Sequence, residues 1–145
     1  MTGGAPEPKG TGYRVLLVED HPLNAELVRD LLESEGVTVL HSTTAEEALA
    51  VAWQLQLDMV MIDLALPGMD GLEATRRLKA DPLTHDLCVV VLTARAMKAD
   101  EDAALAQGCD AYMTKPIDTR TFSRQVLDLL QARDEPRSRR PPPAG

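Results

Sequence analysis

The sequence predicts an α/β fold in which helices cover both faces of a five-stranded parallel sheet, an arrangement described as doubly wound. Five short aliphatic runs recur along the 145 residues, and a stretch with apolar residues at helical spacing follows each of them. The runs are continuously apolar and do not alternate, which is typical of strands buried on both faces. A chain of this length favours one domain, and right-handed crossovers would connect its strands. The spacing alone does not fix the order of the strands.

Composition and charge narrow the functional classes. The chain is 44% hydrophobic but only 3% aromatic, so its core must be mostly aliphatic. A formal net charge of -8 would repel a phosphate backbone, which argues against direct binding of nucleic acid. The longest apolar runs, such as residues 88–92, are too short to cross a bilayer, and the N-terminus has no apolar signal core, so we expect a cytoplasmic protein without membrane contact. Cys88 and Cys109 form no metal or redox motif and are expected to be buried thiols.

The first strand and helix follow an N-terminal segment that we expect to be flexible. Residues 1–12 are rich in Gly, Pro and Thr and cannot bury apolar surface. The first strand is predicted at Arg14–Val18, where the sequence RVLLV lacks polar alternation. Pro22 suits the first turn of a helix, and Gly36 supplies its C-terminal stop.

The second unit repeats the pattern. A strand is predicted at residues 37–41, and apolar residues at helical spacing follow over residues 45–55. Either Thr43 or Thr44 can cap this helix, because a threonine hydroxyl accepts a hydrogen bond from a free N–H of the first turn.

The third and fourth units are the most apolar part of the chain. Residues 59–62 form a wholly apolar strand, and a loop rich in Pro and Gly at residues 67–71 precedes a helix through residues 72–78. Residues 88–92 form the fourth strand, and an alanine-rich helix is predicted at residues 99–107.

The fifth unit closes the domain. Gly108 ends the preceding helix, Ala111–Thr114 forms a short strand, and residues 122–130 carry the apolar stripe of a last helix. The Pro- and Arg-rich residues 133–145 are expected to be a disordered tail, which leaves residues 13–132 as the domain.

Four polar residues fall at the ends of these predicted strands, and they are Asp20, Asp63, Thr93 and Lys115. In an open parallel sheet the carboxyl ends of the strands are where ligands bind, so these side chains should converge. Two carboxylates, a hydroxyl and an ammonium suit a divalent metal and a phosphoryl group. Each residue alone would more often be a helix cap or a solvated side chain, and only the combination indicates function.

Four motifs resemble the CheY-type receiver domains of bacterial two-component response regulators. They are VLLVED at residues 15–20, MIDLALPGMDG at 61–71, VVLTA at 90–94 and YMTKP at 112–116. The resemblance spans residues 13–132 and implies a flavodoxin-like sheet with strand order 2-1-3-4-5. The stretch from residue 96 to residue 116 also resembles receivers of hybrid sensor kinases and free-standing DivK-like regulators.

The acidic residues point to a magnesium site. Neighbouring carboxylates repel one another, and Mg²⁺ relieves that repulsion because it is a hard ion that takes oxygen ligands and keeps several waters. We expect Asp20 and Asp63 to be direct ligands and Glu19 to act mainly through water. The resemblance adds the backbone carbonyl of Ala65 as a further ligand.

The resemblance assigns a role to each remaining site residue. Asp63 would attack a phosphohistidine of a partner and become an aspartyl phosphate. The Lys115 ammonium would balance the added charge together with Mg²⁺, and the Thr93 hydroxyl would bind a phosphoryl oxygen. In the family, an aromatic residue three positions before the lysine, here Tyr112, then turns inward and changes the face formed by the fourth helix, fifth strand and fifth helix. Pro116 matches the family's cis-proline.

The resemblance also implies the partners. A sensor histidine kinase or a histidine phosphotransfer protein would dock on the first helix and on the loop after the lysine, at Leu23, Asn24, Leu27, Pro116 and Ile117. A downstream protein, or a second copy of the chain, would bind the switched face. Ala65 and Arg95 line the family's water path and act in opposite directions, so the sequence predicts no phosphoryl lifetime.

Other classes remain as alternatives. The chain could be a receiver module of a larger hybrid histidine kinase or multidomain regulator. An aspartate-nucleophile phosphatase would need a second aspartate where Ala65 stands. A flavodoxin-like flavin protein would need a Gly- and hydroxyl-rich phosphate loop after the first strand, where this chain has EDHP. A receiver is a switch that catalyses only its own phosphorylation and dephosphorylation, so we expect no enzyme.

Overall fold

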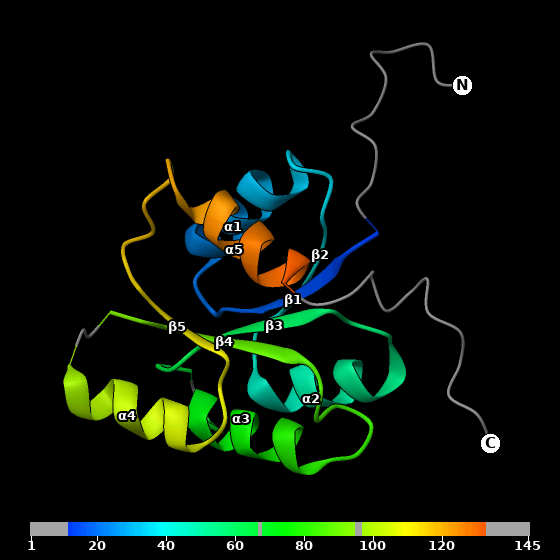
Figure 1. Ribbon diagram of the computed structural model, residues 1–145, viewed down its shortest axis with the longest axis vertical. Coiled ribbons are helices and arrows are strands. Elements are labelled where there is room, and N and C mark those ends of the chain that lie inside the picture. The colour runs from blue at the N-terminus through cyan, green and yellow to red at the C-terminus, as the bar shows by residue number, and fades with distance from the viewer. Residues whose placement is uncertain (1–11, 67, 95–96, 133–145) are drawn as a thin grey trace.

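The computed structural model describes residues 12–66, 68–94 and 97–132, and Figure 1 shows a central sheet between two layers of helices. The strands are β1 (Arg14–Val18), β2 (Thr38–Ser42), β3 (Met59–Asp63), β4 (Cys88–Thr93) and β5 (Ala111–Thr114). The helices are α1 (Pro22–Glu33), α2 (Ala45–Gln54), α3 (Gly71–Ala80), α4 (Lys98–Ala106) and α5 (Phe122–Gln131). The strands are parallel and lie in the order β2-β1-β3-β4-β5, which confirms the predicted fold class and the order that the family resemblance implied.

The two helical layers bury both faces of the sheet. In Figure 1, α1 and α5 lie above the sheet, and α2, α3 and α4 lie below it. Alternate residues of β1 enter different clusters: Leu16 and Val18 pack with α2, α3 and α4, whereas Val15 and Leu17 pack with α1 and α5. Burial on both sides is the reason that the strand sequences show no polar alternation. The flexible segments predicted at the two ends lie outside the described residues apart from Gly12, so the domain boundaries stay a prediction.

The end of α1 shifts the start of β2 by one residue from the prediction. Gly36 has a φ of +83°, and the N–H of Val37 donates to the carbonyl of Leu32 at 3.2 Å. This bond closes the C-terminus of α1. The N–H of Val37 is therefore engaged by the helix, and pairing with β1 begins one residue later, at Thr38. β2 then extends to Ser42, beyond the predicted end.

The two cysteines are both buried and free, as predicted. Cys88 begins β4, and Cys109 lies in the turn before β5. Burial raises the pKa of the Cys109 thiol, and the nearby Asp110 carboxylate adds to this effect. The Cys109 thiol is therefore not an activated nucleophile.

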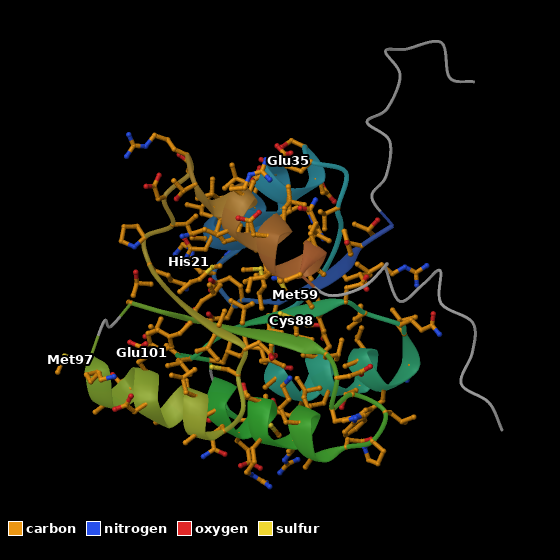
Figure 2. The ribbon with its side chains drawn as sticks, viewed as in Figure 1. His21, Glu35, Met59, Cys88, Met97 and Glu101 are labelled. Atoms are coloured by element: carbon orange, nitrogen blue, oxygen red, sulfur yellow. The ribbon has the colours of Figure 1, made fainter. Side chains whose placement is uncertain are left out.

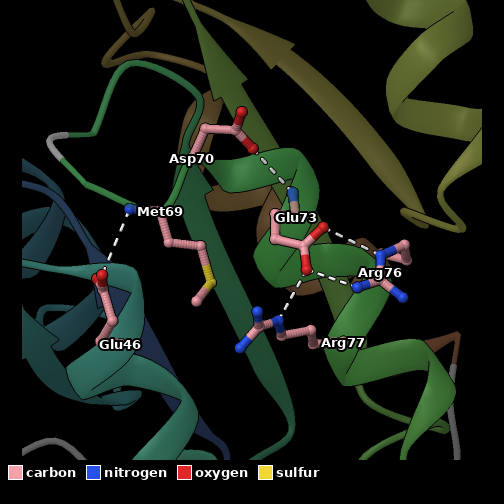
Figure 3. Close-up of polar contacts among 6 residues, drawn as sticks. All are labelled: Glu46, Met69, Asp70, Glu73, Arg76 and Arg77. Atoms are coloured by element: carbon pink, nitrogen blue, oxygen red, sulfur yellow. Dashed lines mark hydrogen bonds and ion pairs between the residues drawn. The ribbon is translucent and has the colours of Figure 1, made fainter.

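The start of α3 is held by side chains that cap it and tie it to α2. Figure 3 shows the Asp70 carboxylate accepting a hydrogen bond from the N–H of Glu73 at 2.8 Å, which satisfies one of the free N–H groups of the first turn. The Glu73 carboxylate in turn accepts hydrogen bonds from Arg76 and Arg77 at 2.5 and 2.8 Å. Glu46 of α2 accepts a longer bond, 3.4 Å, from the N–H of Met69 in the loop before α3.

We expect the Glu73 carboxyl to titrate with a pKa of about 2, below its ordinary value of 4.5. Hydrogen bonds from Arg76 and then Arg77 stabilise the charged form, and they outweigh the opposing effect of burial. Because the pKa is lower in the folded chain, any contribution to stability is present above pH 4.5 and is lost as the pH falls toward 2. A carboxyl NMR titration measures this value. Replacing both arginines by Gln should return it toward 4.5, and a wild-type midpoint already at 4.5 would contradict the prediction.

Candidate functional site

The structure brings the four predicted residues to the carboxyl-terminal edge of the sheet. Asp63 and Thr93 are the last residues of β3 and β4, and not residues just past them as the sequence predicted, because the Leu64 N–H continues the pairing by donating to the Leu92 carbonyl at 2.9 Å. Lys115 follows β5 directly, and its N–H donates to the carbonyl of Thr93 at 2.7 Å. Three neighbouring strands therefore end at one place.

Lys115 joins two carboxylates that lie far apart in the sequence. Its Nζ donates to Asp63 Oδ2 at 2.5 Å and to Glu19 Oε1 at 2.7 Å. Glu19 is only 2% exposed and Asp63 only 5% exposed, so little water screens these pairs. Burial alone would lower the pKa of the Lys115 ammonium, but the hydrogen bonds to both carboxylates outweigh burial and raise it. Lys115 therefore stays positively charged.

Glu19, Asp20 and Asp63 form an acidic cluster in which one oxygen from each residue lies within 4.8 Å of the others. Within residues 12–66, 68–94 and 97–132 it is the one group of three potential ligands with this spacing. Asp20 is exposed whereas its two neighbours are buried, so the cluster opens to solvent on one side. Three carboxylates in this arrangement match the oxygen donors that Mg²⁺ prefers.

Backbone contacts fix the acidic side chains in place. Asp63 Oδ1 accepts a hydrogen bond from the N–H of Ala65 at 2.9 Å, so both carboxylate oxygens of Asp63 are held. Glu19 Oε2 accepts a bond from the N–H of His21 at 3.2 Å. The backbone carbonyl of Glu19 lies 2.7 Å from Nε2 of His41, and because a carbonyl only accepts, this ring nitrogen carries the proton.

A pocket of about 450 Å³ opens beside Asp63. Its described lining consists of Asp63, Leu64, Ala65, Thr93, Ala94, Asp100 and Lys115. Thr93 is 4% exposed, so its hydroxyl belongs to the buried wall of this pocket. Sequence analysis did not identify Asp100, which α4 supplies from its first turn.

The sequence placed Gly71 in the loop at residues 67–71 but did not indicate that it contributes to the site. It begins α3 directly against the end of β3. A Cβ atom added to Gly71 would lie 2.9 Å from the Asp63 carbonyl oxygen and 2.9 Å from Cγ2 of Ile62. The absence of a side chain here therefore allows α3 to approach the backbone of Asp63.

Replacing Gly71 by Ala should destabilise the chain by about 1–3 kcal/mol, because the new methyl group meets backbone that cannot move without displacing Asp63. We also expect slower labelling of the variant by acetyl phosphate. Urea unfolding and mass spectrometry measure the two effects. Gly36→Ala is the matched control, because the φ of +83° would be strained for alanine and the residue lies at the opposite edge of the sheet. This control should lose stability but keep its labelling rate, and equal labelling of both variants would contradict the prediction.

Tyr112 and the residues predicted for docking are all half-buried or exposed. Tyr112 is half-buried in β5 and lines a groove of about 440 Å³ between β5 and α5. Leu23 is 70% exposed, and the peptide bond between Lys115 and Pro116 is cis, as the resemblance implied. The other proposed docking residues are the half-buried Asn24 and Ile117 and the exposed Leu27. Arg95 lies outside the described residues.

A doubly wound parallel sheet whose carboxyl edge combines an acidic cluster, a hydroxyl and a charged lysine defines a phosphoryl-accepting signalling domain. The model of the response regulator receiver domain family matches residues 15–127, and the chain belongs to this family. Receiver domains interact with histidine kinases or phosphotransfer proteins. Within the described residues, no helix has the length and apolar character needed to cross a bilayer.

Known relatives agree with this assignment. The polar-differentiation response regulators DivK of Brucella ovis and Brucella abortus are 38% identical over 116 residues, covering 80% of this chain and 94% of theirs. A putative response regulator from Chloroflexus aurantiacus has a TM-score of 0.78 at 28% identity and covers 82% of this chain and 98% of its own. The receiver domain of a sensor histidine kinase from Pseudomonas aeruginosa, with magnesium coordinated in its active-site cleft, has a TM-score of 0.73 at 30% identity and covers 83% of this chain and 96% of its own.

Proposed function

We propose that this receiver accepts a phosphoryl group on Asp63 from a phosphohistidine of a sensor histidine kinase or a histidine phosphotransfer protein. One observation carries the assignment of the residue. Among the described residues, Asp63 is the one carboxylate that belongs both to the acidic cluster and to the lining of the pocket. Asp63 would therefore be able to contact both a bound metal and an incoming phosphoryl group.

The acidic cluster fits Mg²⁺ as its cofactor. Asp20 and Asp63 would be direct ligands, Glu19 would act through water, and the Ala65 carbonyl would complete the set. The three clustered carboxylates support this proposal, and so does the magnesium held by the Pseudomonas aeruginosa receiver. When bound, Mg²⁺ supplies positive charge that lowers the repulsion between the carboxylates and an incoming phosphoryl group.

The chain's own residues position and stabilise the reacting groups. An oxygen of Asp63 forms a bond to phosphorus while the bond from phosphorus to the imidazole nitrogen breaks, and the electron pair stays with the imidazole. Lys115 already touches Asp63 Oδ2 and would balance the charge of the phosphoryl oxygens. The Thr93 hydroxyl would donate a hydrogen bond to one of them. We propose that the chain catalyses only its own phosphorylation and dephosphorylation and acts as a signalling switch.

The phosphodonor would dock on the exposed start of α1 and the loop after β5, through Leu23, Asn24, Leu27, Pro116 and Ile117. The output surface is the α4-β5-α5 face, where Tyr112 would respond to the position of Thr93. A downstream protein or a second copy of the chain would bind there. The cytoplasmic location expected from the sequence stays a prediction, and no comparison favours the flavin-binding or phosphatase alternatives.

Mass spectrometry of the whole chain tests this proposal. We expect acetyl phosphate to add one phosphoryl group in the presence of Mg²⁺ and far less in the presence of a chelator. Reduction of the acyl phosphate with borohydride and peptide mapping should place the group on Asp63. Labelling that ignores Mg²⁺, or that maps to another residue, would overturn the proposal.

A further inference from the structure

The pocket beside Asp63 holds a second carboxylate, that of Asp100, to which neither the acidic cluster nor the proposed switch assigns a role. Asp100 lies in the first turn of α4, whose N-cap is Met97, and its side chain is half-buried. Figure 2 shows the start of α4, marked by Met97 and Glu101, on the same left-hand side of the molecule as His21, which follows the acidic pair of the β1–α1 loop. Asp100 therefore faces the pocket from a different element than the acidic cluster.

Helix stabilisation alone leaves the orientation of Asp100 unexplained. An acidic residue in the first turn is favourable because of the helix dipole, but Glu101 already supplies such a charge in the same turn of α4. The nearby Lys98 pairs with Asp102 at 3.2 Å and not with Asp100. In the described part of the chain, the Asp100 carboxylate takes part in no hydrogen bond or ion pair, so it is available to a water molecule in the pocket.

The polar side chains that line the pocket differ in whether they can take up a proton. Thr93 offers a hydroxyl donor, and the Lys115 ammonium donates to the Asp63 and Glu19 carboxylates. Neither can take a proton from water at neutral pH. Asp63 would itself carry the phosphoryl group, so its carboxylate is no longer free. Asp100 is then the one described side chain of the pocket that can accept a proton from an attacking water.

We propose that Asp100 is the general base that hydrolyses the aspartyl phosphate and so limits its lifetime; this inference rests on the proposed function of Asp63. The oxygen of a pocket water forms a bond to phosphorus while Asp100 takes a proton from that water. The bond between phosphorus and the Asp63 oxygen breaks, and the electron pair returns to the Asp63 carboxylate. Inorganic phosphate leaves, and Asp100 releases its proton to solvent through the open side of the pocket.

The lifetime of the preformed phosphoprotein tests this role. The whole chain is labelled with acetyl phosphate and Mg²⁺, freed of the reagent by desalting, and followed by intact-mass spectrometry. We expect Asp100→Asn to lose its phosphoryl group at least about tenfold more slowly than the wild type. Asp102→Asn is the matched control, because it removes the same charge from the exposed side of α4 and should keep the wild-type lifetime.

Two readouts separate proton transfer from a merely structural role. If Asp100 only stabilised the start of α4 through its charge, Asp100→Asn would lower the unfolding midpoint but keep the wild-type lifetime, and an unchanged lifetime would overturn the inference. Hydrolysis by the wild type should be about twofold slower in D₂O, and this ratio should fall toward one in the variant. An unaltered ratio would also overturn it. If the wild-type chain takes up no phosphoryl group, the proposed function is wrong. If the wild type is labelled but Asp100→Asn keeps the wild-type lifetime, only the role of Asp100 is wrong.

Discussion

Asp63→Asn should abolish labelling of the chain by acetyl phosphate, a loss of at least about a thousandfold. The amide keeps the shape of the carboxylate but removes the anionic oxygen that would attack phosphorus. Its oxygen can still accept the hydrogen bond from Lys115 or from the N–H of Ala65, so we expect the fold to survive. Intact-mass spectrometry measures the labelling, and thermal unfolding should give a midpoint within about 5 °C of the wild type.

Two matched variants show whether this loss is specific to Asp63. Asp70→Asn makes the same chemical change at the N-cap of α3, where asparagine caps as well as aspartate, and it should label at the wild-type rate. Asp20→Asn removes a proposed metal ligand but keeps the nucleophile. It should need more Mg²⁺ to reach the same labelling. Residual labelling of Asp63→Asn on another residue would show that the nucleophile has been assigned wrongly.

The sequence predicted the strands and the convergence of Asp63, Thr93 and Lys115, because the first depends on local pattern and the second on a general property of parallel sheets. Continuous apolar runs are typical of strands covered on both faces, and β1 and β3 have this burial. The carboxyl ends of parallel strands meet at one edge, so Asp63, Thr93 and Lys115 could be grouped from their positions in the sequence alone. The family resemblance supplied the strand order and the functional roles.

The contacts that the sequence missed are those made between distant segments. The sequence pattern assigned Glu19 a role beside the metal but did not indicate that its carboxylate binds the Lys115 ammonium, 96 positions further along the chain. The close approach of Gly71 to the Asp63 carbonyl depends on the angle at which α3 leaves the sheet. Asp100 appears in sequence as one of several acids in a helix, and only the fold shows which of them lines the pocket. Local periodicity contains none of this information.

Lys115→Met should destabilise the chain by about 2–4 kcal/mol, because it leaves the Glu19 and Asp63 carboxylates buried without their cation. The methionine keeps most of the side-chain volume, so the decrease in the free energy of unfolding reflects the lost charge more than lost packing. Urea unfolding in a buffer with a chelator measures it. Lys79→Met is the matched control, because Lys79 pairs with Asp110 at 2.7 Å outside the pocket.

Added Mg²⁺ should distinguish the two lysine variants. In the wild type the Lys115 ammonium contacts two of the carboxylates that would hold the metal, so it already offsets part of their mutual repulsion. Without Lys115, a metal would be the remaining positive charge beside Glu19 and Asp63. We therefore expect Mg²⁺ to raise the unfolding midpoint more for Lys115→Met than for the wild type, and no more for Lys79→Met than for the wild type. An equal Mg²⁺ response in all three chains would show that Lys115 and the metal do not compete for one acidic cluster.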